Sequence, residues 1–324
     1  MDRPQLSVVA PCYNEADGID EFHRRTSAAC KSLGQSYEIV LINDGSKDAT
    51  WEKMLSLGAK DEHLVLIDLS RNHGHQLALT AGLSVCQGDY ILILDADLQD
   101  PPELADAMLK LMRDQKADVV YGRRNKRPGE TLFKLTTAAM FYRIIQKLSD
   151  TPIPVDTGDF RLISRRALDV LQKMPERHRF VRGMVSWIGF KQVPLFYDRD
   201  IRYAGETKYP LRKMLRFAKD AITSFSIKPL ALASYTGFAF ALLAMILVGY
   251  TILSWLVYRT QPGWTSLMAG MSLLGSVQLL VLGIFGEYLG RLYEQSKGRP
   301  LFIIRDVVRG DQIAPPDNDA GRHP

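Results

Sequence analysis

The sequence contains few cysteines and lacks the glycine-rich loops that bind phosphates in the commonest α/β folds. Its 324 residues include three cysteines, Cys12, Cys30 and Cys86, whose spacing does not match a metal site. We interpret them as small apolar residues in a reducing compartment. No G-x-G-x-x-G or G-x-x-x-x-G-K-[ST] pattern is present, so the dinucleotide-binding and P-loop classes are excluded.

Other absences narrow the class further. The first 30 residues carry no apolar signal core, which predicts that the N-terminal part stays in the compartment where it is made. The formal net charge of +5 is modest, and no aromatic-rich basic groove or helix-turn-helix pattern is present, so we expect no nucleic-acid partner. The basic residues concentrate instead beside two apolar segments, which favours contact with anionic lipid headgroups.

Two long uncharged stretches predict membrane-spanning helices at about 230–257 and 267–289. Each exceeds the about 20 residues that cross a bilayer as a helix, and the short connection between them predicts a hairpin. Eight Lys or Arg residues lie between 199 and 229 and five between 291 and 310, whereas the connecting loop holds only Arg259. By the positive-inside rule, both termini are expected in the cytoplasm.

The sequence therefore divides into four parts. We expect a cytoplasmic domain over residues 1–209 and a basic amphipathic helix in the headgroup plane over 210–229. The two spans lie within 230–290, and residues 291–324 form a cytoplasmic tail that is polar, Pro-rich and expected to be disordered from about 310. Residues 131–148 have the pattern of a second amphipathic helix, which could equally pack on its own domain.

The cytoplasmic part alternates between strand and helix patterns. Five short runs rich in Val, Ile and Leu predict strands at 6–10, 37–42, 64–69, 90–94 and 118–122. Helical spacing is found at 15–33, 48–57, 75–86 and 102–113. This alternation predicts an α/β fold with a mostly parallel sheet covered by helices, in which ligands bind at the carboxyl ends of the strands.

The segment "ILILDADLQDPPE" places unusual residues at such an end. Asp95, Asp97 and Gln99 present oxygen ligands at alternating positions after a buried strand. Oxygen ligands suit Mg²⁺ or Mn²⁺, and a divalent ion held there could neutralise a diphosphate leaving group. A solvated turn is the alternative for an isolated Asp-x-Asp. Pro101 and Pro102 then fix the turn and open the next helix.

Longer motifs resemble those of the family 2 glycosyltransferases with a GT-A fold. The resemblance runs from residue 7 to residue 230 and rests on "SVVAPCYNE", "VLINDGSKDAT", "LSRNHGHQLALTAGL", "GDYILILDADLQDPPE", "YGRR", "DTGDFRLISRRAL", "RHRFVRGMVSWIGF" and "YAGETKYPLRKMLRFAKDAITSFSIKPL". Within that family the chain is similar to the polyprenyl-phosphate glycosyltransferases, namely the dolichyl-phosphate mannose synthases and, more closely, the bactoprenol glucosyltransferases.

The resemblance implies roles for residues on the donor side of a site. It implies that Asp95 faces the ribose and metal side, and that Asp97 and Gln99 are the metal ligands proper. A loop that includes Gln76 is implied to shape the nucleotide-sugar site. The implied nucleotide-sugar residues are Pro11, Tyr13, Asn14, Glu15, Asp44, Asn72, Gly74 and Asp95.

The same resemblance implies an acceptor side. Asp156 and Asp159 are both candidates for the catalytic carboxylate, and the motif favours Asp156. A lipid phosphate is already mostly dianionic at pH 7, so this carboxylate could orient the nucleophile rather than deprotonate it. Two anions must meet in the site, which requires cations besides the metal. The candidate phosphate and acceptor ligands are Arg123, Arg124, Arg161, Arg202 and Lys208.

The implied activity is metal-dependent transfer of a hexose, with inversion, to a polyprenyl phosphate at the cytoplasmic face of a bacterial inner membrane. UDP-glucose and undecaprenyl phosphate are the expected substrates, and a homo-oligomer is compatible with the sequence. The alternatives are a mannose synthase using GDP-mannose, a processive polysaccharide synthase and, outside the enzymes, a membrane scaffold. A processive synthase is expected to carry a Gln-x-x-Arg-Trp motif and more spans, and this sequence has neither.

Overall fold

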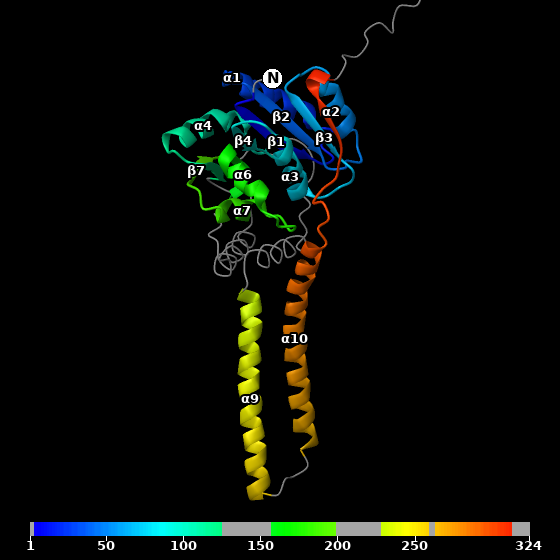
Figure 1. The fold of residues 1–324 in the computed structure, drawn as a ribbon, viewed down its shortest axis with the longest axis vertical. Coiled ribbons are helices and arrows are strands. Elements are labelled where there is room, and N and C mark those ends of the chain that lie inside the picture. The colour runs from blue at the N-terminus through cyan, green and yellow to red at the C-terminus, as the bar shows by residue number, and fades with distance from the viewer. Residues whose placement is uncertain (1–2, 125–156, 199–227, 259–262, 313–324) are drawn as a thin grey trace, which may run out of the picture. The chain divides into compact units, whose positions relative to one another are not determined.

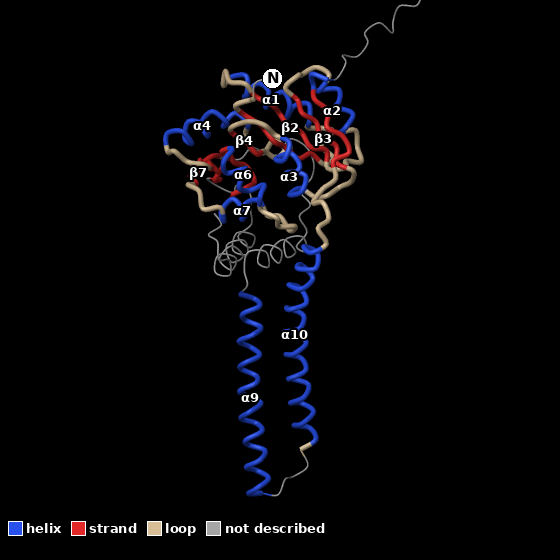
Figure 2. The backbone as a smooth tube through the Cα atoms, in the orientation of Figure 1, coloured by secondary structure: helices blue, strands red, loops and turns tan. Residues whose placement is uncertain are grey.

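The structure is a computed structural model that describes residues 3–124, 157–198, 228–258 and 263–312. The chain forms two units. The first contains described residues 3–124, 157–198 and 300–312, and the second contains 228–258 and 263–299. Figure 1 shows the elements of both units, and Figure 2 shows the strands and helices in separate colours.

The first unit is built on one eight-stranded sheet with the strand order β7-β5-β6-β4-β1-β2-β3-β8. Strands β4, β1, β2 and β3 are parallel neighbours, as are β5 and β7, whereas β6 and β8 run antiparallel to their partners. The strands are β1 (Leu6–Cys12), β2 (Tyr37–Asn43), β3 (Leu64–Leu69), β4 (Tyr90–Ile93), β5 (Val119–Arg124), β6 (Thr157–Ser164), β7 (Gln192–Tyr197) and β8 (Ile304–Arg309). The five predicted strands are confirmed as β1 to β5.

Helices flank this sheet, and the four predicted helices are confirmed with slightly shifted ends. They are α1 (Ile19–Ser32), α2 (Thr50–Gly58), α3 (His75–Val85) and α4 (Ala105–Asp114), the last preceded by the 3₁₀ turn η1 (Pro102–Leu104). Two further helices are α6 (Arg165–Lys173) and α7 (Val181–Trp187), and Ser164 caps α6 because its hydroxyl accepts a hydrogen bond from the Ala167 backbone N–H.

Apolar and polar residues do not alternate along the central strands, because these strands are buried on both faces. Every residue of β1, β2 and β3 is buried, because helices or loops cover both faces of the sheet. The three cysteines are free and buried, and burial raises the pKa of the Cys30 thiol to about 12. The interpretation of the cysteines as small apolar residues is therefore confirmed.

Helix α3 approaches the sheet closely at Gly82. A Cβ atom at that position would lie 2.5 Å from side-chain carbons of both Val9 and Ile42, so only glycine fits without a shift. Strands β1 and β2 thereby fix the position of α3, whose first turn carries His75 and Gln76.

Strand β8 was not predicted, because the sequence analysis assigned residues 291–324 to a tail. It pairs antiparallel with β3 and adds an edge strand to the sheet. Arg305 on β8 donates a hydrogen bond of 2.9 Å to the buried carboxylate of Asp68 on β3. The sheet of the first unit is thus completed by a strand that lies more than 100 residues after β7 in the chain.

The described part of the second unit contains two long neighbouring helices, α9 (Lys228–Tyr258) and α10 (Trp264–Ser296). They contain both predicted spans. Among the described residues, Leu273–Ser296 alone is long and apolar enough to cross a membrane, and Ala233–Leu243 is a shorter apolar stretch. The first span of the predicted hairpin, at about 230–257, therefore remains a prediction. The predicted amphipathic helices at 131–148 and 210–229 lie outside the described residues.

Candidate active site

The loops that follow β1 and β2 are joined to each other by Asn14. Its backbone N–H donates to the hydroxyl of Ser46 at 3.0 Å, and its side-chain Oδ1 accepts from the backbone N–H of Lys47 at 2.9 Å. Asn14 has a φ of 56°, in the left-handed region that asparagine tolerates better than most residues. The side chain of Asn14 therefore shapes this edge, while the neighbouring Tyr13 is exposed and Pro11 is buried in β1.

Asp44 holds the loop after β3 in place. Its carboxylate is buried and accepts hydrogen bonds from the backbone N–H groups of His73 at 2.7 Å and Gly74 at 3.0 Å. Burial raises the pKa of Asp44, although these hydrogen bonds oppose the rise. Gly45, with a φ of +63°, lets the two loops touch, because a Cβ there would lie 2.5 Å from the Asn72 backbone nitrogen. The structure thus brings together Asp44, Asn72 and Gly74.

The Asp-x-Asp segment follows β4 as an irregular loop. Asp97 Oδ1 accepts a hydrogen bond of 3.1 Å from the Gln99 backbone N–H, and the intervening Leu98 has a φ of 58°. Asp95 Oδ1 is buried and has no hydrogen-bond partner among the described residues, although His75 Nε2 lies 3.5 Å away. Burial is the main reason that the pKa of Asp95 rises to about 6. This carboxylate oxygen could therefore bind a cation.

Asp159 on β6 is enclosed by three donors. Its Oδ1 accepts from Arg182 Nε at 2.7 Å, and its Oδ2 accepts from His75 Nε2 at 3.1 Å and from Gln76 Nε2 at 3.0 Å. The side chain of Asp159 is only 4% exposed. Burial alone would raise its pKa, but the positive charge of Arg182 and the His75 hydrogen bond outweigh burial and hold the pKa well below its usual range. Asp159 is therefore ionised and a poor proton acceptor.

His75 connects the two carboxylates. The side chain is 43% exposed, and the hydrogen bond to Asp159 and the charge of Asp95 outweigh its partial desolvation and raise the pKa to about 9. His75 is therefore protonated at neutral pH. His75, Asp95 and Asp159 each place a ligand atom within 4.8 Å of the other two.

The predicted phosphate-binding cations have different environments. Arg161 is buried and donates to the backbone carbonyl oxygens of Gly158 at 3.1 Å and Asp159 at 3.3 Å, and burial lowers its pKa to about 10. Arg124 lies beside Gly158, where a Cβ would be 3.1 Å from its Nη2, and its buried Nε has no hydrogen-bond partner among the described residues. Arg123 stacks over Phe196 at 5.4 Å.

Three predicted site residues, Asp156, Arg202 and Lys208, lie outside the described residues. No role was predicted from the sequence for His75 or Arg182. "RHRFVRG" contributed to the family resemblance, but nothing in its pattern indicated which of its cations would face Asp159. That contact depends on how α7 packs against β6, which is a property of the tertiary fold.

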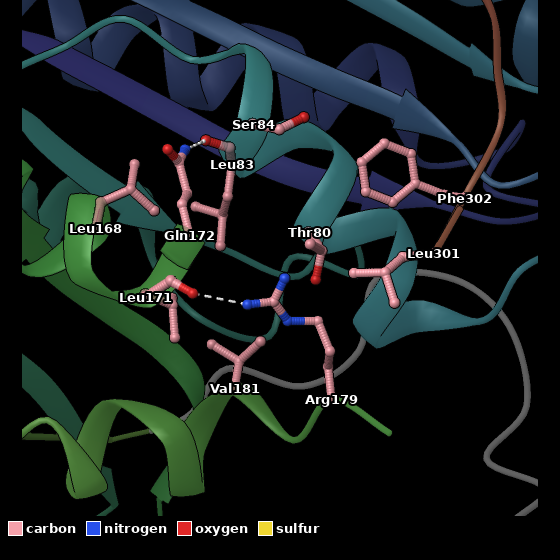
Figure 3. A pocket seen from close by; sticks show the side chains of 10 residues that line it. All are labelled: Thr80, Leu83, Ser84, Leu168, Leu171, Gln172, Arg179, Val181, Leu301 and Phe302. Carbon is pink, nitrogen blue, oxygen red and sulfur yellow. Dashed lines mark hydrogen bonds between the residues drawn. The ribbon is translucent and has the colours of Figure 1, made fainter. Parts of the chain in front are cut away.

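A separate apolar pocket of about 250 Å³ lies beside this site within the first unit (Figure 3). Helices α3, α6 and α7 contribute most of its wall, and the segment before β8 contributes Leu301 and Phe302. Val181 lines the pocket with its side chain, while its backbone N–H donates to Gln76 Oε1 at 2.9 Å. The start of α7 therefore separates the pocket from the carboxylate site.

An oxygen-rich site at the carboxyl edge of a largely parallel sheet is typical of enzymes that bind nucleotides through a divalent ion. The sequence matches the family described as "Glycosyl transferase family 2" over residues 7–171. It is 47% identical to the "Uncharacterized glycosyltransferase YkcC" of Bacillus subtilis, with 93% of each chain covered. It is 37% identical to the "Prophage bactoprenol glucosyl transferase homolog" of Escherichia coli, with 94% of this chain and all of that one covered.

The chain therefore belongs to glycosyl transferase family 2 and is a glycosyltransferase. The predicted enzyme class and the GT-A α/β fold with a mostly parallel sheet are confirmed. Among the solved structures that match the chain is glucosyl-3-phosphoglycerate synthase from Mycobacterium tuberculosis in complex with Mn²⁺, UDP and phosphoglyceric acid. Its TM-score is 0.47, with 19% identity and coverage of 68% of this chain and 77% of that one.

Proposed function

We propose that the protein transfers glucose from UDP-glucose to undecaprenyl phosphate at the cytoplasmic face of a membrane, with inversion at the anomeric carbon. The observation that carries this proposal is that His75 pairs with both Asp95, whose Oδ1 has no hydrogen-bond partner among the described residues, and the enclosed, ionised carboxylate of Asp159. The relatives named bactoprenol glucosyl transferase support the choice of sugar and lipid.

The donor binds across the loops after β1, β2 and β3 in this proposal. The exposed ring of Tyr13 and the carboxylate of Glu15 provide surfaces for a base and a ribose, while the buried carboxylate of Asp44 supports them by holding the loop after β3. Asn14 and Gly74 then act by shaping these loops, because their described contacts are with the chain itself. Asn72 lies at the contact between the two loops.

The residues present fit a divalent ion. Asp95 offers a buried oxygen without a hydrogen-bond partner among the described residues, and Asp97 lies on the same loop. Asp95, Asp97 and Gln99 would hold Mg²⁺ or Mn²⁺, for which oxygen ligands are preferred. When bound, the ion would neutralise charge on the departing nucleoside diphosphate. His75 is protonated and hydrogen-bonded to Asp159, which argues against it as a ligand in this state.

The acceptor phosphate needs little assistance in losing a proton, but its negative charge must be offset by cations when it approaches the donor diphosphate. Its second pKa is near 6, so it is mostly dianionic at neutral pH, and the low pKa of Asp159 is compatible with a role other than that of a base. Two unit charges of the same sign at about 4 Å repel by about 4 kcal/mol in a partly dry site. Protonated His75 and Arg182 supply two positive charges around one carboxylate, and Arg123, Arg124, Arg161, Arg202 and Lys208 remain the proposed phosphate and acceptor ligands.

The reaction is a single displacement. An oxygen of the acceptor phosphate attacks the anomeric carbon, a new carbon–oxygen bond forms, and the bond to the nucleoside diphosphate breaks with its electron pair on the departing oxygen. No proton transfer and no covalent enzyme intermediate are required. Asp156 and Asp159 are the proposed catalytic carboxylates, and Asp159 acts as a fixed anion that orients His75 and Arg182.

Helices α9 and α10 anchor the enzyme in this proposal. Leu273–Ser296 is apolar enough to span a bilayer, and exposed apolar side chains such as Phe238, Met245 and Leu253 suit α9 to a lipid environment. The distribution of Lys and Arg then places both termini in the cytoplasm. A reporter fused after residue 324 should be active in the cytoplasm, and a label that cannot cross the membrane should reach a cysteine introduced between α9 and α10 from outside only.

The function can be tested with the purified full-length protein, UDP-glucose and undecaprenyl phosphate, with and without EDTA. We expect a lipid-linked glucose that forms only without the chelator and disappears in the Asp159→Asn and Asp97→Asn variants. Product from GDP-mannose alone would instead identify a mannose synthase, and a polymer would identify a processive synthase. No transfer with any of these donors would overturn the proposal and favour a scaffold.

A further inference from the structure

Gln76 is the one neutral side chain of the three that hold Asp159, and it has two partners on two different elements. Its Nε2 donates to Asp159 Oδ2 on β6 at 3.0 Å, and its Oε1 accepts from the Val181 backbone N–H on α7 at 2.9 Å. A carboxylate can only accept here and a backbone N–H can only donate, so the chemistry of the partners fixes the orientation of the amide. The side chain therefore bridges α3, β6 and α7.

The contact with Val181 also completes the start of α7. The first N–H groups of a helix have no acceptor within the helix, and Phe180, the residue before α7, has no side-chain acceptor to cap it. Gln76 supplies an acceptor from α3 instead. Arg182 follows Val181 directly, so the same amide that holds the Asp159 carboxylate also fixes the backbone that carries its counter-charge.

We propose that Gln76 is a positioning residue for glycosyl transfer, and that it acts by holding Asp159 and the Arg182-bearing start of α7 in one fixed arrangement. This inference rests on the proposed function, in which Asp159 is a catalytic carboxylate. It differs from the role that the family resemblance implies for Gln76, which was to shape the nucleotide-sugar loop. In this structure the amide of Gln76 contacts Asp159 and Val181.

Two substitutions separate positioning of Asp159 from simple packing. Gln76→Leu removes both hydrogen bonds, and Gln76→Glu preserves the size of the side chain and can still accept from Val181 while placing a second carboxylate against Asp159. If Gln76 only packs α3 against α7, the isosteric Glu variant should be the milder one. If Gln76 positions the ionised Asp159, the Glu variant should be the more damaging one, because two carboxylates at hydrogen-bond distance repel.

Gln192 provides a matched control. Its side-chain Nε2 donates to the backbone carbonyl of Val185, in the same helix α7, at 3.1 Å. Gln192→Leu therefore removes a glutamine contact with α7 without removing a described contact to Asp159. Any effect that comes only from loosening α7 should appear in this variant too.

The experiment measures kcat, the KM for UDP-glucose, UDP affinity by calorimetry and thermal unfolding, using full-length protein with undecaprenyl phosphate. We expect kcat to fall about 10- to 100-fold in Gln76→Leu and further in Gln76→Glu, as for loss of a hydrogen bond to a charged group. The KM and UDP affinity should change less than about twofold, because the donor loops keep their contacts, and Gln192→Leu should retain wild-type kcat.

Wild-type kcat in Gln76→Leu, a milder effect of Gln76→Glu, or an equal loss in Gln192→Leu would each overturn the positioning role. Asp159→Asn measured in parallel separates this failure from failure of the proposed function. If Asp159→Asn is inactive while Gln76→Leu is fully active, only the inference about Gln76 is wrong. If Asp159→Asn is fully active, the proposed role of Asp159 is wrong and the positioning role falls with it.

Discussion

Arg182 Nε lies 2.7 Å from Oδ1 of Asp159, and this ion pair joins the start of α7 to the strand β6 beside the Asp-x-Asp loop. The side chain of Asp159 is 4% exposed and that of Arg182 is 24% exposed, so water screens the pair only weakly. A buried carboxylate without its cation is strongly unfavourable. The ionised state of Asp159, on which the proposed mechanism depends, is therefore set largely by Arg182.

Replacing Arg182 by Met should weaken both activity and stability. We expect kcat to fall at least about 100-fold and the free energy of unfolding at neutral pH to fall by about 3 kcal/mol, since one partner of a buried pair is removed. In the wild type, the low pKa of Asp159 gives stability that is present above the ordinary value of 3.8 and is lost as pH falls through the lowered value. In the variant His75 alone opposes burial, so the pKa of Asp159 should lie higher than in the wild type and less stability should be lost as pH falls.

Thermal unfolding of both proteins from neutral pH down to about pH 2 measures this difference. Lys110→Met is the control, because Lys110 also pairs with an aspartate, Asp106, but the two side chains are 70% and 52% exposed. That substitution should cost no more than about 1 kcal/mol. Equal losses in the two variants would contradict the special role given to the Arg182 pair.

His75 should contribute stability that is lost as the pH becomes alkaline. Its pKa is raised from 6.5 to about 9 because the hydrogen bond to Asp159 and the charge of Asp95 outweigh burial. A raised histidine pKa gives stability that is fully present below 6.5 and is lost as pH rises through about 9. Unfolding midpoints of the wild type and of His75→Gln should therefore converge between these pH values. Parallel curves across that window would show that His75 is not protonated in the folded protein.

Metal and donor binding should weaken in acid because a proton competes for Asp95. Burial raises the pKa of Asp95 to about 6, and a bound cation would lower it. We expect UDP binding in the presence of Mn²⁺ to decline as pH falls through about 6 and to be lost with EDTA or with Asp97→Asn. Calorimetry measures this directly. Asp89 is half-exposed and directly precedes β4, at the opposite end of that strand from Asp95. The Asp89→Asn variant should therefore bind UDP as the wild type does.

The sequence predicted the parts of this protein whose signals are local. Runs of Val, Ile and Leu indicated β1 to β5, and the structure places the polar residues that follow them after the carboxyl ends of these strands. β8 was missed because "IIRDVVR" follows a predicted span and binds a strand far away in sequence, so its pairing depends on loop closure rather than on pattern. His75 and Arg182 were missed for the same reason, since each contacts Asp159 through tertiary packing.

Asn14 makes a structural contact that its motif does not indicate. The family resemblance of "PCYNE" implies that Asn14 binds the nucleotide, and the structure adds that its side-chain oxygen accepts a hydrogen bond from the Lys47 backbone N–H. A residue type suited to ligand binding is equally suited to joining loops, and only coordinates show where its hydrogen bonds go.

Gly82 should be intolerant of even a methyl group, because the close packing of α3 on the sheet sets where His75 and Gln76 lie. A Cβ there would be 2.5 Å from carbons of Val9 and Ile42, both fully buried. Overpacking of this kind costs about 1–3 kcal/mol, so the unfolding midpoint of Gly82→Ala should fall by about 2–10 °C. Gly286→Ala on α10, where no atom lies within 4 Å of the added carbon among the described residues, should unfold as the wild type does. An unchanged midpoint in Gly82→Ala would mean that α3 can move away from β1 and β2 at little cost, and kcat should then also stay unchanged.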